Sequence, residues 1–304
     1  MLRSASSTGG PGRGAARVPA TTMALSTAAT SKARRRRKPP PSSRRFVESK
    51  GLLHSVGASL LDITTTVGAA GILLGRIFAR TFTLKVDRDE LFRNMYRMGM
   101  RSVPIVVITA LFVGAIAVIQ AAPFVQRVGA YGLLGWGAGF VVLRELGPLL
   151  VALMINGRVG ANNTAELGTM VVTEQVDALR VLAIDPISFL VAPRFIGIVV
   201  TLFLSTVFAD VLALLGAALA GQALLGVTPI MFYRGVTGGV LNEWDVLSGI
   251  VKSIIFGGII GLSSCQFGLG VTGGAPGVGK AVNATVVASA AGMFVADYFV
   301  SFGL

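Results

Sequence analysis

Long apolar stretches dominate the last two thirds of this 304-residue chain. An α-helix needs about 20 mostly apolar residues to cross the hydrocarbon core of a bilayer. Five stretches reach that length and carry few charges: residues 102–122, 132–155, 195–225, 246–269 and 281–304. The pattern predicts an all-α integral membrane protein with five transmembrane helices.

Two further helices are expected before the first span, within residues 48–101. Residues 51–77 are mostly apolar but are interrupted by Asp62 and three threonines, which favours a helix lying in the membrane interface. Residues 84–101 mix five basic residues with leucine, phenylalanine and methionine, a pattern typical of an amphipathic elbow helix at the lipid headgroups. Residues 102–304 then make up the five-span domain.

Composition supports the membrane assignment and locates the charge. The chain is 53% hydrophobic and 13% charged, whereas soluble domains carry about 25% charged residues. Eleven of the 27 basic residues and none of the 14 acidic residues lie in residues 1–47, so the rest of the chain carries only +2 of the net +13. The positive charge therefore belongs to a tail, which argues against a nucleic-acid partner.

The tail, residues 1–47, is rich in Ser, Ala, Pro and Arg and is expected to be disordered, because it has too few apolar residues to form a core. Three interpretations stay open for it. It is an organelle transit peptide, or a segment that binds anionic lipid, or it has no such role and is either a solvated tail or a mis-assigned start with Met23 as the true beginning.

The sequence offers no residues for catalysis or for a metal site. One cysteine, Cys265, and one histidine, His54, exclude an internal disulfide and a His-rich metal cluster. Residues 274–280 resemble a phosphate-binding loop, but Ala281 stands where magnesium coordination needs Ser or Thr. We therefore expect no cofactor, interpret this segment as a tight cytoplasmic turn, and assign ATP hydrolysis to another chain. A membrane-embedded enzyme is also disfavoured.

Basic residues between positions 80 and 101 precede the first span, which predicts that this side is cytoplasmic. The connection between the second and third spans then lies on the same side, and the C-terminus lies outside.

That connection holds the one long polar stretch of the five-span domain. A helix is expected over about residues 164–183, with Asn163 or Thr164 as its N-cap and Pro186 beyond its end. It has one polar and one apolar face, and the apolar face needs a docking partner. A separate cytosolic subunit is the expected partner. The residues expected on the two faces are Leu167, Met170, Val171, Leu179 and Leu182 on the apolar face and Glu174, Asp177 and Arg180 on the polar face.

The same region resembles the MlaE/YrbE family of ABC transporter permeases. The resemblance covers about residue 84 to the C-terminus and is carried by RELGP at 144–148, GRVG at 157–160, AELGTM at 165–170, TEQVDAL at 173–179, DP at 185–186, PR at 193–194 and GGAPGVGK at 273–280.

Several properties follow from the resemblance alone. It implies a homodimer of permeases, each with an interfacial helix and five spans, seated on two cytosolic ABC ATPases. It also implies an MCE-domain substrate-binding protein outside the membrane and phospholipid or a related lipid as cargo. By analogy, the helix at 164–183 is the coupling helix that sits in a groove of the ATPase. Its candidate contact residues are Glu166, Glu174, Gln175, Asp177 and Arg180.

Charged residues inside the expected spans are the remaining candidates. Arg144 and Glu145 are costly in hydrocarbon, and neighbouring residues on a helix point about 100° apart, so each needs a partner of its own. They either line a lipid pathway, where Arg144 binds a lipid phosphate, or pair with other spans. An alternative function is proton-coupled secondary transport through Asp210 and Asp297.

The compartment stays open between two membranes. A bacterial inner membrane is the first expectation for such a multi-pass protein. The plastid inner envelope is the alternative, because the acid-free tail fits a transit peptide.

Overall fold

The computed structural model describes residues 52–82, 88–238 and 241–303. The chain divides into two units at Ser59, and the architecture below is that of Leu60–Leu304. The regular structure in the described ranges is entirely helical, as the sequence predicts. The tail over residues 1–47, with its three interpretations, lies outside the described residues.

Five helical segments are long and apolar enough to cross a membrane, which confirms the predicted all-α fold. The second of them is built from helices α4, α5 and α6, and the third contains helix α8. The five segments are α3 (Val103–Val128), Tyr131–Val172, Ile187–Leu225, α10 (Glu243–Leu269) and α11 (Gly274–Gly303).

Two helices precede the first span. Helix α1 runs over Leu52–Phe82, and helix α2 runs over Arg88–Met100 and packs along α8 (Ala192–Leu225). Ile77 on α1 is buried among residues of α6 and α8, and Gln266 Nε2 donates a hydrogen bond of 2.8 Å to the carbonyl oxygen of Thr66. The part of α1 from Thr66 to Ile77 is therefore held to the spans.

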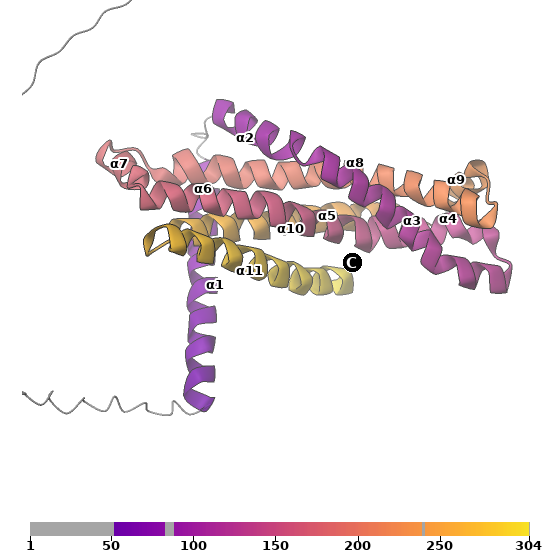
Figure 1. Ribbon diagram of the computed structural model, residues 1–304, viewed down its shortest axis with the longest axis horizontal. Helices are drawn as coiled ribbons and strands as arrows, with labels where there is room; N and C mark the ends of the chain where they lie inside the picture. Colours follow the sequence, from indigo (N-terminus) through magenta and orange to yellow (C-terminus); the bar gives the residue numbers. More distant parts are fainter. Residues whose placement is uncertain (1–51, 83–87, 239–240, 304) are drawn as a thin grey trace, which may run out of the picture. The chain divides into compact units, whose positions relative to one another are not determined.

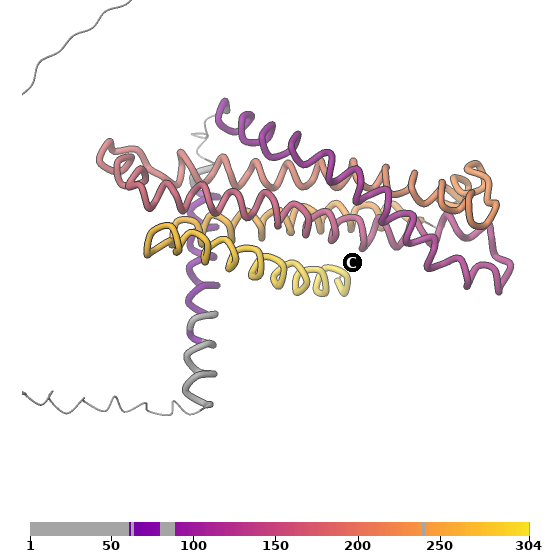
Figure 2. The backbone as a smooth tube through the Cα atoms, viewed as in Figure 1, coloured from indigo at the N-terminus to yellow at the C-terminus, as the bar shows by residue number. Residues whose placement is uncertain are grey.

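The spans pack through small residues and a shared apolar core. Figure 1 shows α3 crossing α8, where Gly114 lies against the carbonyl group of Ala213 and Gly216 lies against that of Leu111. A side chain at either glycine would keep the two backbones apart. Figure 2 shows the C-terminal helix α11, in yellow, running beside α6 and α10.

The second span is not a uniform α-helix. Helices α4 (Leu134–Val141), α5 (Gly147–Ile155) and α6 (Ala161–Val172) are joined by π-helical turns at Val142–Leu146 and Asn156–Gly160. Such turns change the direction of the side chains that follow and are frequent at functional sites. Two of the motifs that carry the family resemblance coincide with these turns.

The cytoplasmic helix differs from the prediction of one helix over residues 164–183. It begins earlier, because α6 continues directly from the second span through the π-helical turn, so that neither Asn163 nor Thr164 is an N-cap. It also breaks at Glu174, whose positive φ of 59° interrupts the helix, and α7 then runs over Gln175–Val181. The predicted coupling segment, a name kept below for residues 164–183, therefore consists of two helices.

The glycine-rich segment 274–280 is a second correction. The sequence predicts a tight turn there, but Gly274 begins α11, so these residues form the first two turns of that helix. The turn itself comes earlier, after α10 ends at Leu269, and includes Gly273 with φ of 83°.

Candidate functional site

A cluster of charged side chains lies between the second, fourth and fifth spans. Arg144 Nη1 lies 3.0 Å from Asp245 Oδ1, and the guanidinium group also lies over the ring of Phe140, 5.5 Å from its centroid. Asp245 is in the first turn of α10, where its other oxygen accepts a hydrogen bond from the backbone N–H of Asn242. Asp245 therefore caps α10 and fixes Arg144 at the same time.

Lys252 is the centre of this buried charge cluster, which comprises Arg144, Glu145, Asp245, Lys252 and Asp297. Its side chain is fully buried, and its Nζ lies 2.7 Å from Glu145 Oε2 and 2.9 Å from Asp297 Oδ1. The same Nζ donates a hydrogen bond of 3.0 Å to the carbonyl oxygen of Arg144, in the first π-helical turn. One lysine thus joins three spans.

The partners explain how the membrane-spanning region accommodates these charges. Burying an ion in a medium of low dielectric costs several kcal/mol unless a counter-ion and further hydrogen bonds compensate. Arg144 and Glu145 have separate partners, as helix geometry predicts, and Ser301 Oγ adds a hydrogen bond of 3.0 Å to Glu145. Glu145 keeps about a third of its side chain exposed, at 36%, and is the more exposed member of the pair.

Asp210 and Asp297 lie in different surroundings. Asp297 pairs with Lys252, whereas Asp210 lies against Gly147, and its Oδ1 finds no hydrogen-bond partner among the residues described. No contact that would make a two-carboxylate relay joins them in the described ranges.

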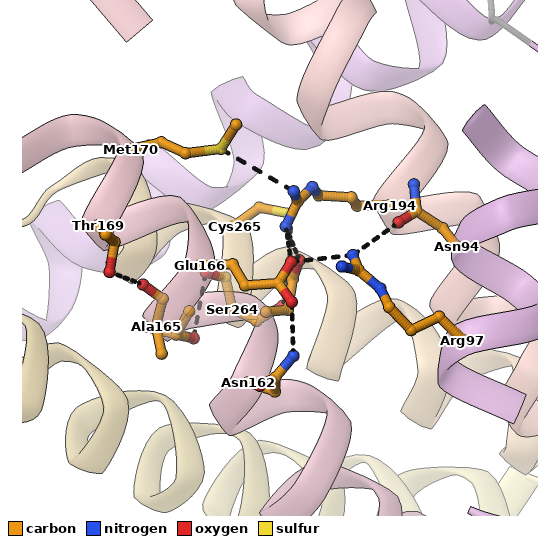
Figure 3. A network of polar contacts seen from close by, with 12 residues as sticks. Asn94, Arg97, Asn162, Ala165, Glu166, Thr169, Met170, Arg194, Ser264 and Cys265 are labelled. Atoms are coloured by element: carbon orange, nitrogen blue, oxygen red, sulfur yellow. Dashed lines mark hydrogen bonds and ion pairs between the residues drawn. The ribbon is translucent and has the colours of Figure 1, made fainter. Parts of the chain in front are cut away.

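A second network lies at the opposite end of the second span, where Glu166 on α6 is bound from two sides (Figure 3). Its Oε2 lies 2.9 Å from Arg97 Nη2 on α2 and 3.0 Å from Arg194 Nη1 at the start of α8. Asn162 Nδ2 donates a hydrogen bond of 2.8 Å to the other oxygen. One carboxylate therefore ties α6 to both α2 and α8.

Asn163 extends this Glu166 network toward the fourth span. Its Oδ1 accepts a hydrogen bond of 3.1 Å from Arg194, and its Nδ2 donates one of 2.8 Å to Ser264 Oγ on α10. Arg194 is only 5% exposed, so its charge depends on these contacts. The sequence does not predict that Arg97 and Arg194 are the partners of Glu166, because they lie 69 and 28 residues away and no local pattern links such distant positions.

The end of the coupling segment presents a different surface, which we call the α6–α7 end (residues 173–182). Glu174, Gln175, Asp177 and Arg180 are all exposed, and Arg180 Nη1 lies 2.8 Å from Asp177 Oδ1. Val176 is buried and anchors α7 to the membrane-spanning helices. Four of the five candidate coupling residues thus lie on the surface, and Glu166 is half-buried in its network.

The apolar face of the coupling segment is covered mostly by the chain itself, which corrects the expectation that a partner covers all of it. Leu167, Met170, Val171 and Leu179 pack with Ile77 and neighbouring apolar residues. The most exposed apolar residues lie at the end of the segment, with Val181 87% exposed and Leu182 69% exposed, and Val172 at the end of α6 is 40% exposed. The surface left for a partner is small and lies at the tip.

These features define a multi-pass helical membrane protein with most of the charges between its spans paired and with a short exposed segment at residues 173–182. A family model described as "Permease MlaE" matches residues 91–302. The chain belongs to the MlaE permease family.

Individual relatives agree with the family model. The chain is 37% identical over 233 residues to a probable ABC transporter permease protein of Synechocystis sp., covering 77% of this chain and 88% of that one. It is 33% identical over 250 residues to a probable ABC transporter permease protein of Rickettsia felis, covering 82% of this chain and 96% of that relative. It is 34% identical over 230 residues to the protein TRIGALACTOSYLDIACYLGLYCEROL 1, chloroplastic, of Arabidopsis thaliana, covering 76% of this chain and 65% of that relative.

The chain is therefore an ABC transporter permease, a transport subunit rather than an enzyme, and its family implies an ATPase partner. This class decides against the proton-coupled secondary transporter as the alternative.

Proposed function

We propose that this permease moves phospholipid or a related lipid between membranes, driven by ATP hydrolysis in a separate subunit. The observation that carries the proposal is the exposed α6–α7 end, where charged residues and two apolar side chains stay open at the tip of a helix that continues into the second span. The Arabidopsis relative bears the name of a glycolipid, trigalactosyldiacylglycerol, which supports lipid as the cargo class.

In this proposal Glu174, Gln175, Asp177 and Arg180 contact the ATPase directly, because all four are exposed. Glu166 acts one step further in, as a positioning residue. When the ATPase moves α6, the ion pairs of Glu166 with Arg97 and Arg194 pull the elbow helix α2 and the start of α8 along with it.

Arg144 and Glu145 are proposed to border the lipid pathway, with Glu145 reached by the headgroup through its exposed third. The ion pairs with Asp245 and Lys252 support this role by holding both side chains in fixed positions. A pathway residue that is already neutralised contacts a zwitterionic or neutral headgroup without a large electrostatic penalty.

The proposed assembly is a homodimer bound to two ATPase subunits inside and to an MCE-domain protein outside. The compartment is a bacterial inner membrane or, as the alternative, the plastid inner envelope, since relatives include cyanobacterial, rickettsial and chloroplast proteins. Adjacent genes for an ABC ATPase and an MCE-domain protein would support the bacterial assembly, and import of the full chain into isolated chloroplasts would support the plastid one.

The function is tested by reconstituting the full chain with its ATPase in vesicles that contain a self-quenched fluorescent phospholipid, with acceptor vesicles and the MCE-domain protein present. We expect lipid transfer to require ATP and to be unchanged by a protonophore. Asp210→Asn should transfer lipid at the wild-type rate. Transfer that proceeds without ATP and stops when the proton gradient is dissipated would overturn the proposal.

A further inference from the structure

A small cavity lies beside the Glu166 network, between α2 and the second π-helical turn of the second span. It has a volume of about 150 Å³. Its lining comes from three separate segments, namely the end of α2, the π-helical turn and the first turn of α6. The lining residues are Arg97, Met98, Arg101, Arg158, Val159 and Asn162.

Three guanidinium groups border this cavity, and two of them have no counter-ion among the residues that the structure describes. Arg97 is bound to Glu166 and to Asn94 Oδ1, at 2.9 and 3.1 Å. Arg101 and Arg158 form no ion pair with any residue in the described ranges. Like charges that line one cavity repel one another unless an anion lies between them. The cavity therefore has an excess of positive charge, on two arginines that are also exposed.

The depth of the cavity in the bilayer indicates which anion it meets. Arg101 precedes the first residue of α3, Val103, by two positions, and therefore lies at the edge of the first span. On the second span, about 20 residues counted from Leu134 are enough to cross the hydrocarbon. At a rise of 1.5 Å per residue, Arg158 lies about 7 Å beyond the end of that stretch. The headgroup layer is about 5–7 Å thick on each side, so by this count of residues both arginines fall within it or at its edge.

The chemistry of the lining selects phosphate. Arginine presents a planar fork of donors that binds two phosphate oxygens at once, and such charge-assisted hydrogen bonds are among the strongest in proteins. Asn162 adds a side-chain amide at the rim, although its Nδ2 also donates to Glu166. A zwitterionic headgroup such as phosphocholine offers the same phosphate, but its cation opposes the positive charge of the lining, so a headgroup with a net negative charge binds more tightly.

We propose that the cavity formed by Arg97, Arg101, Arg158 and Asn162 binds a phosphate group at the cytoplasmic surface of the membrane. Its depth favours the headgroup of an anionic phospholipid over free phosphate as the source. Because Arg97 belongs to both the cavity and the Glu166 network, an anion there competes with Glu166 for the same guanidinium group. Anionic lipid then adjusts how firmly α2 is tied to α6, whatever lipid is transported.

The test uses the purified full chain in detergent, titrated with phosphatidylglycerol or phosphatidylcholine and followed by native mass spectrometry. Arg101→Gln combined with Arg158→Gln should weaken phosphatidylglycerol binding by about tenfold or more, because two charge-assisted contacts are lost. Phosphatidylcholine binding should be weaker in the wild type and should change less, because its choline cation opposes the positive charge of the lining. The matched control is Arg127→Gln with Arg234→Gln, which removes two exposed arginines outside the cavity.

Further measurements distinguish a lipid headgroup from free phosphate, and a lipid site from a contact with a protein partner. Displacement of phosphatidylglycerol by millimolar inorganic phosphate would assign the cavity to free phosphate, and resistance to it would assign the cavity to lipid. Arg158→Lys, which keeps the charge but loses the planar fork of donors, should bind less phosphatidylglycerol than wild type and more than the double variant.

Equal phosphatidylglycerol binding by wild type and the double variant overturns the proposed site. So does loss of a co-purifying ATPase with lipid binding unchanged, because the arginines then serve a protein partner. None of the lipid titrations depends on transport, so failure here leaves the proposed function untouched.

Discussion

The buried charge cluster and the α6–α7 end use similar side chains for opposite purposes. In the cluster, Lys252 is fully buried and contacts two carboxylates from two other spans. At the α6–α7 end, Asp177 and Arg180 pair with each other on one helix turn, with about two thirds of each side chain exposed. The first arrangement depends on tertiary packing, and the second depends on little beyond the local helix.

The difference shows how to separate charges that hold the permease together from charges available to a partner. A buried ion without its counter-ion destabilises the fold, whereas an exposed ion pair contributes little to stability. Glu166 belongs with the first group despite its place in the coupling segment, because its partners Arg97 and Arg194 come from two other helices. The distinction between structural charges and partner-facing charges predicts an order of mutational effects, which are given below from the largest to the smallest.

Replacing Lys252 should have the largest effect. Lys252→Met leaves Glu145 and Asp297 facing each other without a cation, and we expect a loss of about 3–5 kcal/mol of stability. Thermal unfolding of the detergent-solubilised protein, followed by intrinsic fluorescence, measures it. Lys280→Met, at an exposed position in α11, is the matched control and should unfold at the wild-type temperature. Equal unfolding of both variants and wild type would contradict the assignment of Lys252 as a structural centre.

Glu166→Gln should have the next largest effect. It leaves the buried guanidinium group of Arg194 without its carboxylate, at a cost of about 1–3 kcal/mol. The control is Glu174→Gln, which removes an exposed carboxylate from the same coupling segment and should not change the unfolding temperature. If the two variants unfold alike, Glu166 is not held as the structure indicates. In the reconstituted transporter, Glu166→Gln should also lower lipid transfer per ATP hydrolysed, a readout that lost stability alone does not move.

Reversing charge at the α6–α7 end should spare the fold and affect the partner. Glu174→Lys combined with Asp177→Lys should change stability by no more than about 0.5 kcal/mol, because both positions are exposed. Co-purification of the ATPase should fall by about tenfold or more, since close charge pairs across an interface are worth 1.5 kcal/mol and above. Retention of the complete complex would refute the assignment of these residues to the ATPase contact.

The smallest effect is expected for Asp177→Asn. This change breaks one exposed pair with Arg180 and should cost about 0.3–0.5 kcal/mol at low salt. The difference should disappear in 1 M NaCl, where charges are screened over about 3 Å. A larger, salt-independent loss would mean that the α6–α7 end is packed more tightly than its exposure indicates.

The sequence by itself determined the membrane class, the number of spans and the polar connection between the second and third spans. These properties depend on how many consecutive residues are apolar, and this is a local property of the chain. It also determined that Arg144 and Glu145 need separate partners, because neighbouring side chains on a helix point in different directions. The motifs around positions 144–194 then indicated the family.

Only the tertiary structure decided which charges meet. Arg144 and Asp245 are 101 residues apart, and their contact depends on how two spans are rotated about their axes. The same applies to Glu166, whose residue type suits an exposed helix but whose position on α6 turns it toward Arg97 and Arg194. Helix rotation is set by packing of many small apolar contacts along each span, such as Gly114 against α8, and no local pattern in the sequence specifies it.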